Sequence, residues 1–259
     1  MRRLLAIAVL AIAGCAGSGR DAPGVDSGPV IGEVGGARSR AKIHTELAAM
    51  YYGVGNFGVA LDELRIAKNA DDAYPQAHGM LGLVYMELKE TKLAEESFQR
   101  ALRLAPDDAD INHNYGWFLC QQSGRATESI KYFLQAVRDP LYATPSRSYS
   151  AAGVCSMRAM NTRDAEVFFD RALKVDPNDL VALLQLSEIR YRQGALEEAH
   201  RLITRYNRVV EPTAQSLWLA LRIERKLGER AAEAHLGNQL RRRYPASQEY
   251  ESLQRGQYD

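Results

Sequence analysis

A pattern of small and bulky residues recurs about every 34 residues along most of the chain, and this repetition limits the fold more than any other feature. Its clearest copy, residues 75–108, carries Leu81, Gly82, Tyr85, Ala94, Phe98, Ala101 and Pro106. The small residues Gly82 and Ala94 allow two helices to cross closely, and Pro106 ends the second helix. Because a unit of this size cannot bury its apolar face alone, successive units must stack. The repetition therefore predicts an all-α fold of stacked helix–turn–helix units.

Six such units can be placed along the chain, although the outer ones are eroded. Their approximate ranges are 41–74, 75–108, 109–143, 146–179, 180–213 and 214–247. Asp72 replaces the proline of the first unit, an insertion near residues 121–123 shifts the third, and the last keeps little besides Gly228 and Pro245. Terminal units of such stacks are atypical because they cap the array. The spacing resembles the tetratricopeptide repeat family, which implies a right-handed superhelix over 41–247 and a C-terminal tail at 248–259.

The N-terminus has the character of a targeting segment. A positively charged start is followed by an apolar run over residues 4–13 and then by Gly14 and Cys15. The run is too short to cross a bilayer, which needs about 20 residues. It resembles a bacterial lipoprotein signal peptide, which implies removal of residues 1–14 and acylation of Cys15. An ordinary signal peptide with a chance cysteine is the alternative. Ala16, rather than aspartate, favours a lipid-anchored location on the periplasmic face of the outer membrane.

The next segment is predicted to be a flexible tether. Residues 16–40 contain seven glycines, two prolines, no aromatic residue and no sustained apolar period. Such a composition cannot bury enough apolar surface to offset the entropy lost on ordering. Residues 15–40 are therefore assigned to the lipidated cysteine and a spacer that holds the folded repeats away from the membrane.

The remaining chemistry is sparse. The formal net charge of +1 provides no strong field for nucleic acid. None of the five histidines forms a helical metal-binding pair, and neither His-Glu-x-x-His nor Cys-x-x-Cys occurs. The segment Gly53–Gly58 matches a dinucleotide-binding fingerprint, but it follows a helical segment rather than a strand, which predicts a helix–helix turn. We therefore expect a protein that binds other proteins, without catalytic residues, metal, cofactor or small-molecule substrate.

Two cysteines remain besides Cys15. Cys120 and Cys155 lie on the first helices of the third and fourth units, which pack side by side in such stacks. Because an exported compartment is oxidising, the pair could form a disulfide. The alternative is two buried free thiols that act as small apolar side chains.

The inner wall of the superhelix is the expected binding surface. In the tetratricopeptide family, positions 2, 5, 9, 12 and 13 of each first helix line this wall. Transferred to this chain, these positions include the apolar and aromatic residues Tyr52, Leu83, Met86, Trp117, Val154, Met157, Leu184 and Tyr191. Such a strip suits a peptide that lies in a groove. The alternative is that extra packing turns some of these side chains inward.

Three segments narrow the resemblance. Asn114–Gln121, Tyr132–Ala136 and Asp139–Tyr142, together with the lipoprotein signal, resemble the PilF/PilW family of type IV pilus biogenesis lipoproteins, called pilotins. This resemblance covers essentially the whole chain. It implies that the partner is the pilus secretin subunit, which the protein would help to reach the outer membrane and to multimerise. The competing interpretation is a general envelope scaffold for outer-membrane protein assembly or for recruitment of peptidoglycan enzymes.

Overall fold

The computed structural model describes residues 31–258, with side chains from Gly36 onward, and these residues form helices and connecting turns only. Residues 1–30, which include the predicted signal peptide and Cys15, lie outside the described part. The helices are α1 (Ile31–Gly53), α2 (Phe57–Ala70), α3 (Pro75–Glu87), α4 (Thr91–Leu104), α5 (Ala109–Gln121), α6 (Ala126–Ala136), α7 (Pro145–Arg158), α8 (Thr162–Val175), α9 (Leu180–Arg192), α10 (Leu196–Val209), α11 (Ala214–Leu227), α12 (Arg230–Arg243) and α13 (Gln248–Arg255). Within 31–258, no helix is both long and apolar enough to span a membrane.

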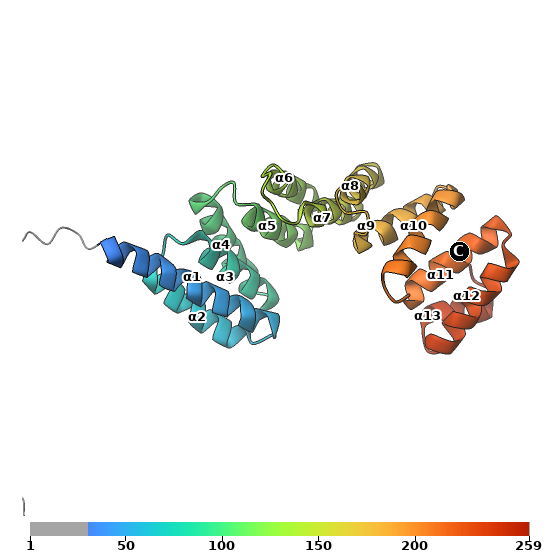
Figure 1. Cartoon of the computed structure of the whole chain (residues 1–259), viewed down its shortest axis with the longest axis horizontal. Helices are drawn as coiled ribbons and strands as arrows, with labels where there is room; N and C mark the ends of the chain where they lie inside the picture. Colours follow the sequence, from blue (N-terminus) through green and yellow to red (C-terminus); the bar gives the residue numbers. More distant parts are fainter. Residues whose placement is uncertain (1–30, 259) are drawn as a thin grey trace, which may run out of the picture.

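The helices form six antiparallel pairs, α1/α2 through α11/α12, that follow one another along a long curved array (Figure 1). Each first helix packs against its own second helix and against the first helix of the next pair. In the middle of the array, α5, α7 and α9 lie on one side and α6 and α8 on the other (Figure 1). The all-α superhelix predicted from the repeat is thus confirmed, and its first helices form one continuous wall.

Local sequence signals explain where several first helices begin. Pro75 and Pro145 occupy the first turns of α3 and α7, where a missing backbone N–H costs nothing. Asp108 and Asp179 precede α5 and α9, and each carboxylate accepts a hydrogen bond of 2.9 Å from the backbone N–H three residues later. The segment Gly53–Gly58 contains the turn between α1 and α2, which is formed by residues 54–56 with Gly55 at a left-handed φ of +75°.

The small residues of the repeat lie where helices cross. A Cβ atom added to Gly82 would lie 2.7 Å from the ring of Phe98, and one added to Gly153 would lie 2.5 Å from Phe169. Both phenylalanines are fully buried. The repeat pattern therefore specifies the same close contact in the second and fourth pairs, where the ring of a phenylalanine packs directly against a glycine.

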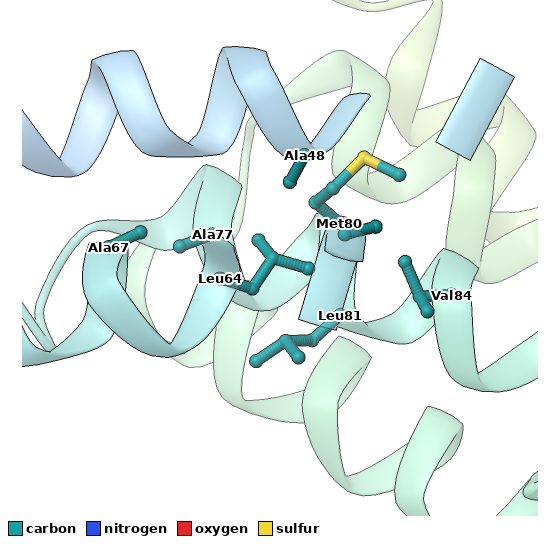
Figure 2. Packing of buried hydrophobic residues seen from close by; sticks show 8 residues of the cluster. Ala48, Leu64, Ala67, Ala77, Met80, Leu81 and Val84 are labelled. Carbon is teal, nitrogen blue, oxygen red and sulfur yellow. The ribbon is translucent and has the colours of Figure 1, made fainter. Parts of the chain in front are cut away.

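The core is divided into clusters, most of which bridge neighbouring pairs. At the N-terminal end, Ala48 of α1, Leu64 of α2 and Met80 of α3 pack in one cluster of eight buried residues (Figure 2). Five of the six clusters among the described residues contain side chains of two neighbouring units, which is how a stack of marginal units becomes one stable array.

The first helix begins earlier than the tether prediction allowed. The composition predicts a spacer that continues to residue 40, but the structure places residues 31–40 in α1. A helix nucleated by the packed residues 41–53 can extend backward, because each further residue adds a hydrogen bond without a new nucleus. Arg38 supports this extension: its guanidinium lies 3.3 Å from the carboxylate of Asp71 and 5.2 Å from the ring centroid of Tyr74.

The predicted C-terminal tail contains a helix. Residues 248–255 form α13, which packs against α11 and α12. Ser247 caps it by accepting a hydrogen bond of 3.1 Å from the backbone N–H of Tyr250. Leu253 packs close to Gly237 of α12. The segment thus covers part of α11 and α12, the last described helix pair.

Candidate protein-binding groove

A groove of 510 Å³ opens on the inner wall between α5, α7 and the start of α9. Its apolar lining combines two of the predicted residues, Trp117 and Val154, with Ala151, Leu180 and Val181. Its polar lining consists of His113, Arg147, Ser150, Asp176, Asn178 and Asp179. The groove therefore has an apolar floor bordered by positively and negatively charged side chains, a combination suited to an amphipathic peptide. We refer to it as the central groove.

Trp117 is half-buried at the floor of the central groove. One side of the residue packs into the cluster that contains Cys120 and Ala151. The guanidinium carbon of Arg158 lies 5.5 Å from its ring centroid, and Nη1 of Arg158 donates a hydrogen bond of 3.3 Å to the carbonyl of Cys120. The indole is thus held in one orientation while part of it remains open to a ligand.

A disulfide joins Cys120 of α5 to Cys155 of α7 beneath this floor. The two Cα atoms are 5.6 Å apart and both residues are buried. Trp117 is one helical turn before Cys120, and Val154 immediately precedes Cys155. The bond therefore links the two helices that carry the predicted apolar residues of the groove.

The other predicted wall residues lie outside the central groove. Five of them, Tyr52, Leu83, Met86, Met157 and Leu184, are half-buried along the first helices. Two show how neighbouring first helices meet: the Tyr52 hydroxyl donates a 3.4 Å hydrogen bond to Glu87, and the Gln121 amide lies 3.6 Å from the sulfur of Met86. They extend the wall along α1, α3, α7 and α9.

Tyr191 does not line an open groove, contrary to the expectation. Only 6% of its surface is exposed. Its ring is covered by the next unit, because the guanidinium carbon of Arg222 lies 4.8 Å and Nζ of Lys226 lies 4.2 Å from the ring centroid. Cation–aromatic packing across the unit boundary turns this position into core.

The polar residues of the groove were not predicted from the sequence, because only apolar and aromatic side chains were considered at the wall positions of the repeat. Arg147 and Val181 occupy position 2 of their units, and His113 and Ser150 occupy position 5. The same frame therefore contained the signal for the polar border. Leu180 and Asp179 lie at the start of α9 and enter the groove through the packing of the fifth unit.

A buried polar network supports the groove from behind. The Ser148 hydroxyl lies 2.8 Å from Nδ1 of His113 and 3.1 Å from the hydroxyl of Tyr142. Burial, with a smaller effect from the nearby Arg147 charge, lowers the pKa of His113 to about 3. The imidazole is therefore neutral at physiological pH and serves as a hydrogen-bonding core residue.

This network predicts an acid-sensitive stability. The unfolded state takes up a proton near the ordinary histidine pKa of 6.5, whereas the folded state does so only near 3, so stability falls as the pH drops through this window. Between pH 7 and pH 5 we expect wild type to lose about 2 kcal/mol more of its unfolding free energy than His113→Gln does. Urea unfolding at the two pH values measures this difference. Equal losses in the two proteins would contradict the proposed role of His113.

The comparisons with known proteins agree with this architecture. The tetratricopeptide repeat model matches residues 75–108. The solved structure of PilW, described as a widely conserved type IV pilus biogenesis factor, is 32% identical and covers 83% of this chain and 98% of its own, with a TM-score of 0.73. The solved structure of PilF from Pseudomonas aeruginosa is 28% identical and covers 85% and 99%, with a TM-score of 0.79.

The fold and the inner wall thus define a tetratricopeptide repeat protein. In sequence, the type IV pilus assembly protein PilF of Pseudomonas aeruginosa is 28% identical over 251 residues, which is 97% of this chain and 96% of that protein. The chain belongs to the PilF/PilW family of type IV pilus biogenesis proteins. The family resemblance inferred from three short segments is therefore confirmed.

Proposed function

We propose that this chain is a lipid-anchored scaffold of the outer membrane that binds the pilus secretin subunit and promotes its localisation and multimerisation. The relation to PilF over 97% of the chain, and to PilW over 83%, carries the proposal, because both relatives are proteins of type IV pilus biogenesis. The proposed role is binding rather than catalysis. Within residues 31–258, no group of three or more His, Cys, Asp or Glu residues could hold a metal ion.

The central groove supports a peptide-binding role. A secretin segment would place an apolar side chain against Trp117 and Val154, where the disulfide below holds both helices in position. Arg147 and Asp179 at the border could each pair with a charge of the segment and so set its direction. Such anchors, an aromatic residue in a partly desolvated cavity, supply most of the affinity in typical interfaces.

Groove substitutions test the binding step. We expect Trp117→Ala and Val181→Asp to weaken binding of the purified secretin subunit by about thirtyfold each, the effect typical of an interface hot spot. Val181 is about half exposed, so its substitution leaves the fold intact. Leu141→Ala, in an exposed loop outside the groove, is the control. Wild-type affinity in both groove variants, measured by titration calorimetry, would exclude the central groove as the secretin site.

Cellular experiments test the biological role. Deletion of the gene should remove heat-stable secretin multimers and surface pili, and unchanged multimers would favour the general envelope scaffold instead.

Separately, Cys15→Ala should preserve the folded repeats but move the protein out of the outer-membrane fraction. Correct sorting of this variant would argue against the lipid anchor while leaving the binding role open.

A further inference from the structure

The inner wall changes character at its C-terminal end. In α11, Trp218, Arg222 and Arg225 occupy wall positions 5, 9 and 12 of the last unit. The guanidinium carbon of Arg222 lies between two rings, 4.8 Å from the centroid of Tyr191 and 5.8 Å from that of Trp218. Arg222 also donates a 3.0 Å hydrogen bond to Glu188. This end of the wall is therefore built from alternating cations and aromatic rings.

One aromatic ring on this wall comes from the far end of the chain. Helix α13 ends at Arg255, and the next residue, Gly256, turns the backbone with a left-handed φ of +67°. The ring of Tyr258 then stacks on Trp218, with a centroid distance of 5.6 Å and an angle of 21° between the planes. The guanidinium carbon of Arg225 lies 3.9 Å from the Tyr258 centroid. Tyr258 is thus held by Trp218 and Arg225.

We propose that Trp218 and Arg225 form a second peptide site, the repeat-six platform, which binds a tyrosine or phenylalanine of a partner segment and which Tyr258 occupies in the free chain. The structure itself shows the ligand chemistry, because an aromatic side chain already fills the site. Stacking on an indole and contact with a guanidinium both select for a flat π system.

The surrounding charges select for acidic neighbours in that partner segment. Four cations, Arg192, Arg222, Arg225 and Lys226, lie on this part of the wall. Arg192 and Arg222 share Glu188, and Arg225 pairs with Glu233 at 2.7 Å. No carboxylate of the described residues lies within 4.0 Å of Lys226. The local excess of positive charge therefore attracts a segment that carries carboxylates beside its aromatic residue.

The contacts that hold Tyr258 are suited to displacement. Beyond α13, Gly256 and Gln257 are exposed, and their backbone N–H groups bond only within the same segment, to the carbonyls of Leu253 at 3.2 Å and Ser252 at 2.9 Å. The Tyr258 ring supplies the described contacts of this end with α11. Surface stacking and cation–π contacts are individually weak, and segments with few buried apolar contacts open readily. The short link through Gly256 and Gln257 keeps the Tyr258 ring at a high local concentration near Trp218, so a partner must compete with this ring. The site would therefore respond to a partner that offers more than one contact.

This inference does not depend on the identity of the partner at the central groove. Its test uses the full mature chain with Tyr258→Ala and, as the probe, an acetylated peptide with the sequence of residues 254–259, Gln-Arg-Gly-Gln-Tyr-Asp. The indole N–H signal of Trp218, assigned with a Trp117→Phe variant, reports on the site by NMR. The Tyr258→Ala chain should show a shifted Trp218 signal, and the peptide should return it toward the wild-type position.

The expected affinities are specific. Because Tyr258 blocks the unsubstituted chain, the peptide should bind Tyr258→Ala about tenfold more tightly, and an alanine version of the peptide should not bind. Adding Arg225→Gln should weaken binding, whereas Arg255→Gln, an equal loss of charge on α13, should not. An unmoved Trp218 signal in Tyr258→Ala would overturn the inference. So would the lack of saturable binding up to roughly 10 mM peptide, above the effective concentration of a short tether.

Discussion

Replacing both Cys120 and Cys155 by alanine is expected to lower the unfolding free energy of the oxidised protein by about 4 kcal/mol. The two residues are 35 positions apart, and closing a loop of that length restricts the unfolded chain by about this amount in the chain-entropy model. Because the bond joins α5 to α7, the loss should be concentrated in the third and fourth units. Urea unfolding under oxidising conditions, combined with hydrogen exchange of these helices, measures it.

The reduced wild-type protein provides the control for this prediction. It should unfold close to the double-alanine variant, and reductant should not change the variant itself. The central groove should also loosen, because Trp117 and Val154 stand on the helices that the bond holds together. Equal stability of the oxidised wild type and the variant would show that packing alone determines the distance between α5 and α7.

The second large effect is expected from Phe169→Ala, which should cost about 4 kcal/mol. Phe169 is fully buried, and its cluster contains the small residues Ala165, Ala172 and Ala182, which cannot move in to fill the space. Since units of a stack are coupled mainly to their neighbours, the transition should also become less cooperative. Thermal unfolding followed by circular dichroism measures both changes.

A double substitution tests the reason for this effect. In wild type, Gly153→Ala should destabilise by about 1–3 kcal/mol, because the new methyl group would meet the Phe169 ring at 2.5 Å. In the Phe169→Ala background the same methyl group enters the vacated space, so the two losses should not add. Phe57→Ala, a half-buried residue at the start of α2, should cost less than half as much as Phe169→Ala. If the losses of unfolding free energy caused by Gly153→Ala and Phe169→Ala simply add, direct packing of the phenylalanine ring against the glycine would be contradicted.

The pairing of helices was predictable because its causes lie close together in sequence. Gly82 and Phe98, or Gly153 and Phe169, are separated by only 16 residues, so one turn brings them into contact whatever the rest of the chain does. The proximity of Cys120 to Cys155 was predictable for the same reason, because consecutive first helices pack side by side. Repetition of the pattern then specifies the stack. The relation to PilF and PilW was predictable from other local segments, Asn114–Gln121, Tyr132–Ala136 and Asp139–Tyr142.

The sequence by itself thus determined the repeated unit, the order of the stack and the position of its inner wall, because these depend on local periodicity and close crossing. Only the tertiary structure decided which wall residues are open. Trp117 borders a groove while Tyr191 is covered by Arg222 and Lys226, which lie more than 30 residues away. The stacking of Tyr258 on Trp218 is likewise decided only by the tertiary structure. Exposure depends on what the next unit and the chain end place against a residue, and no periodic pattern records that.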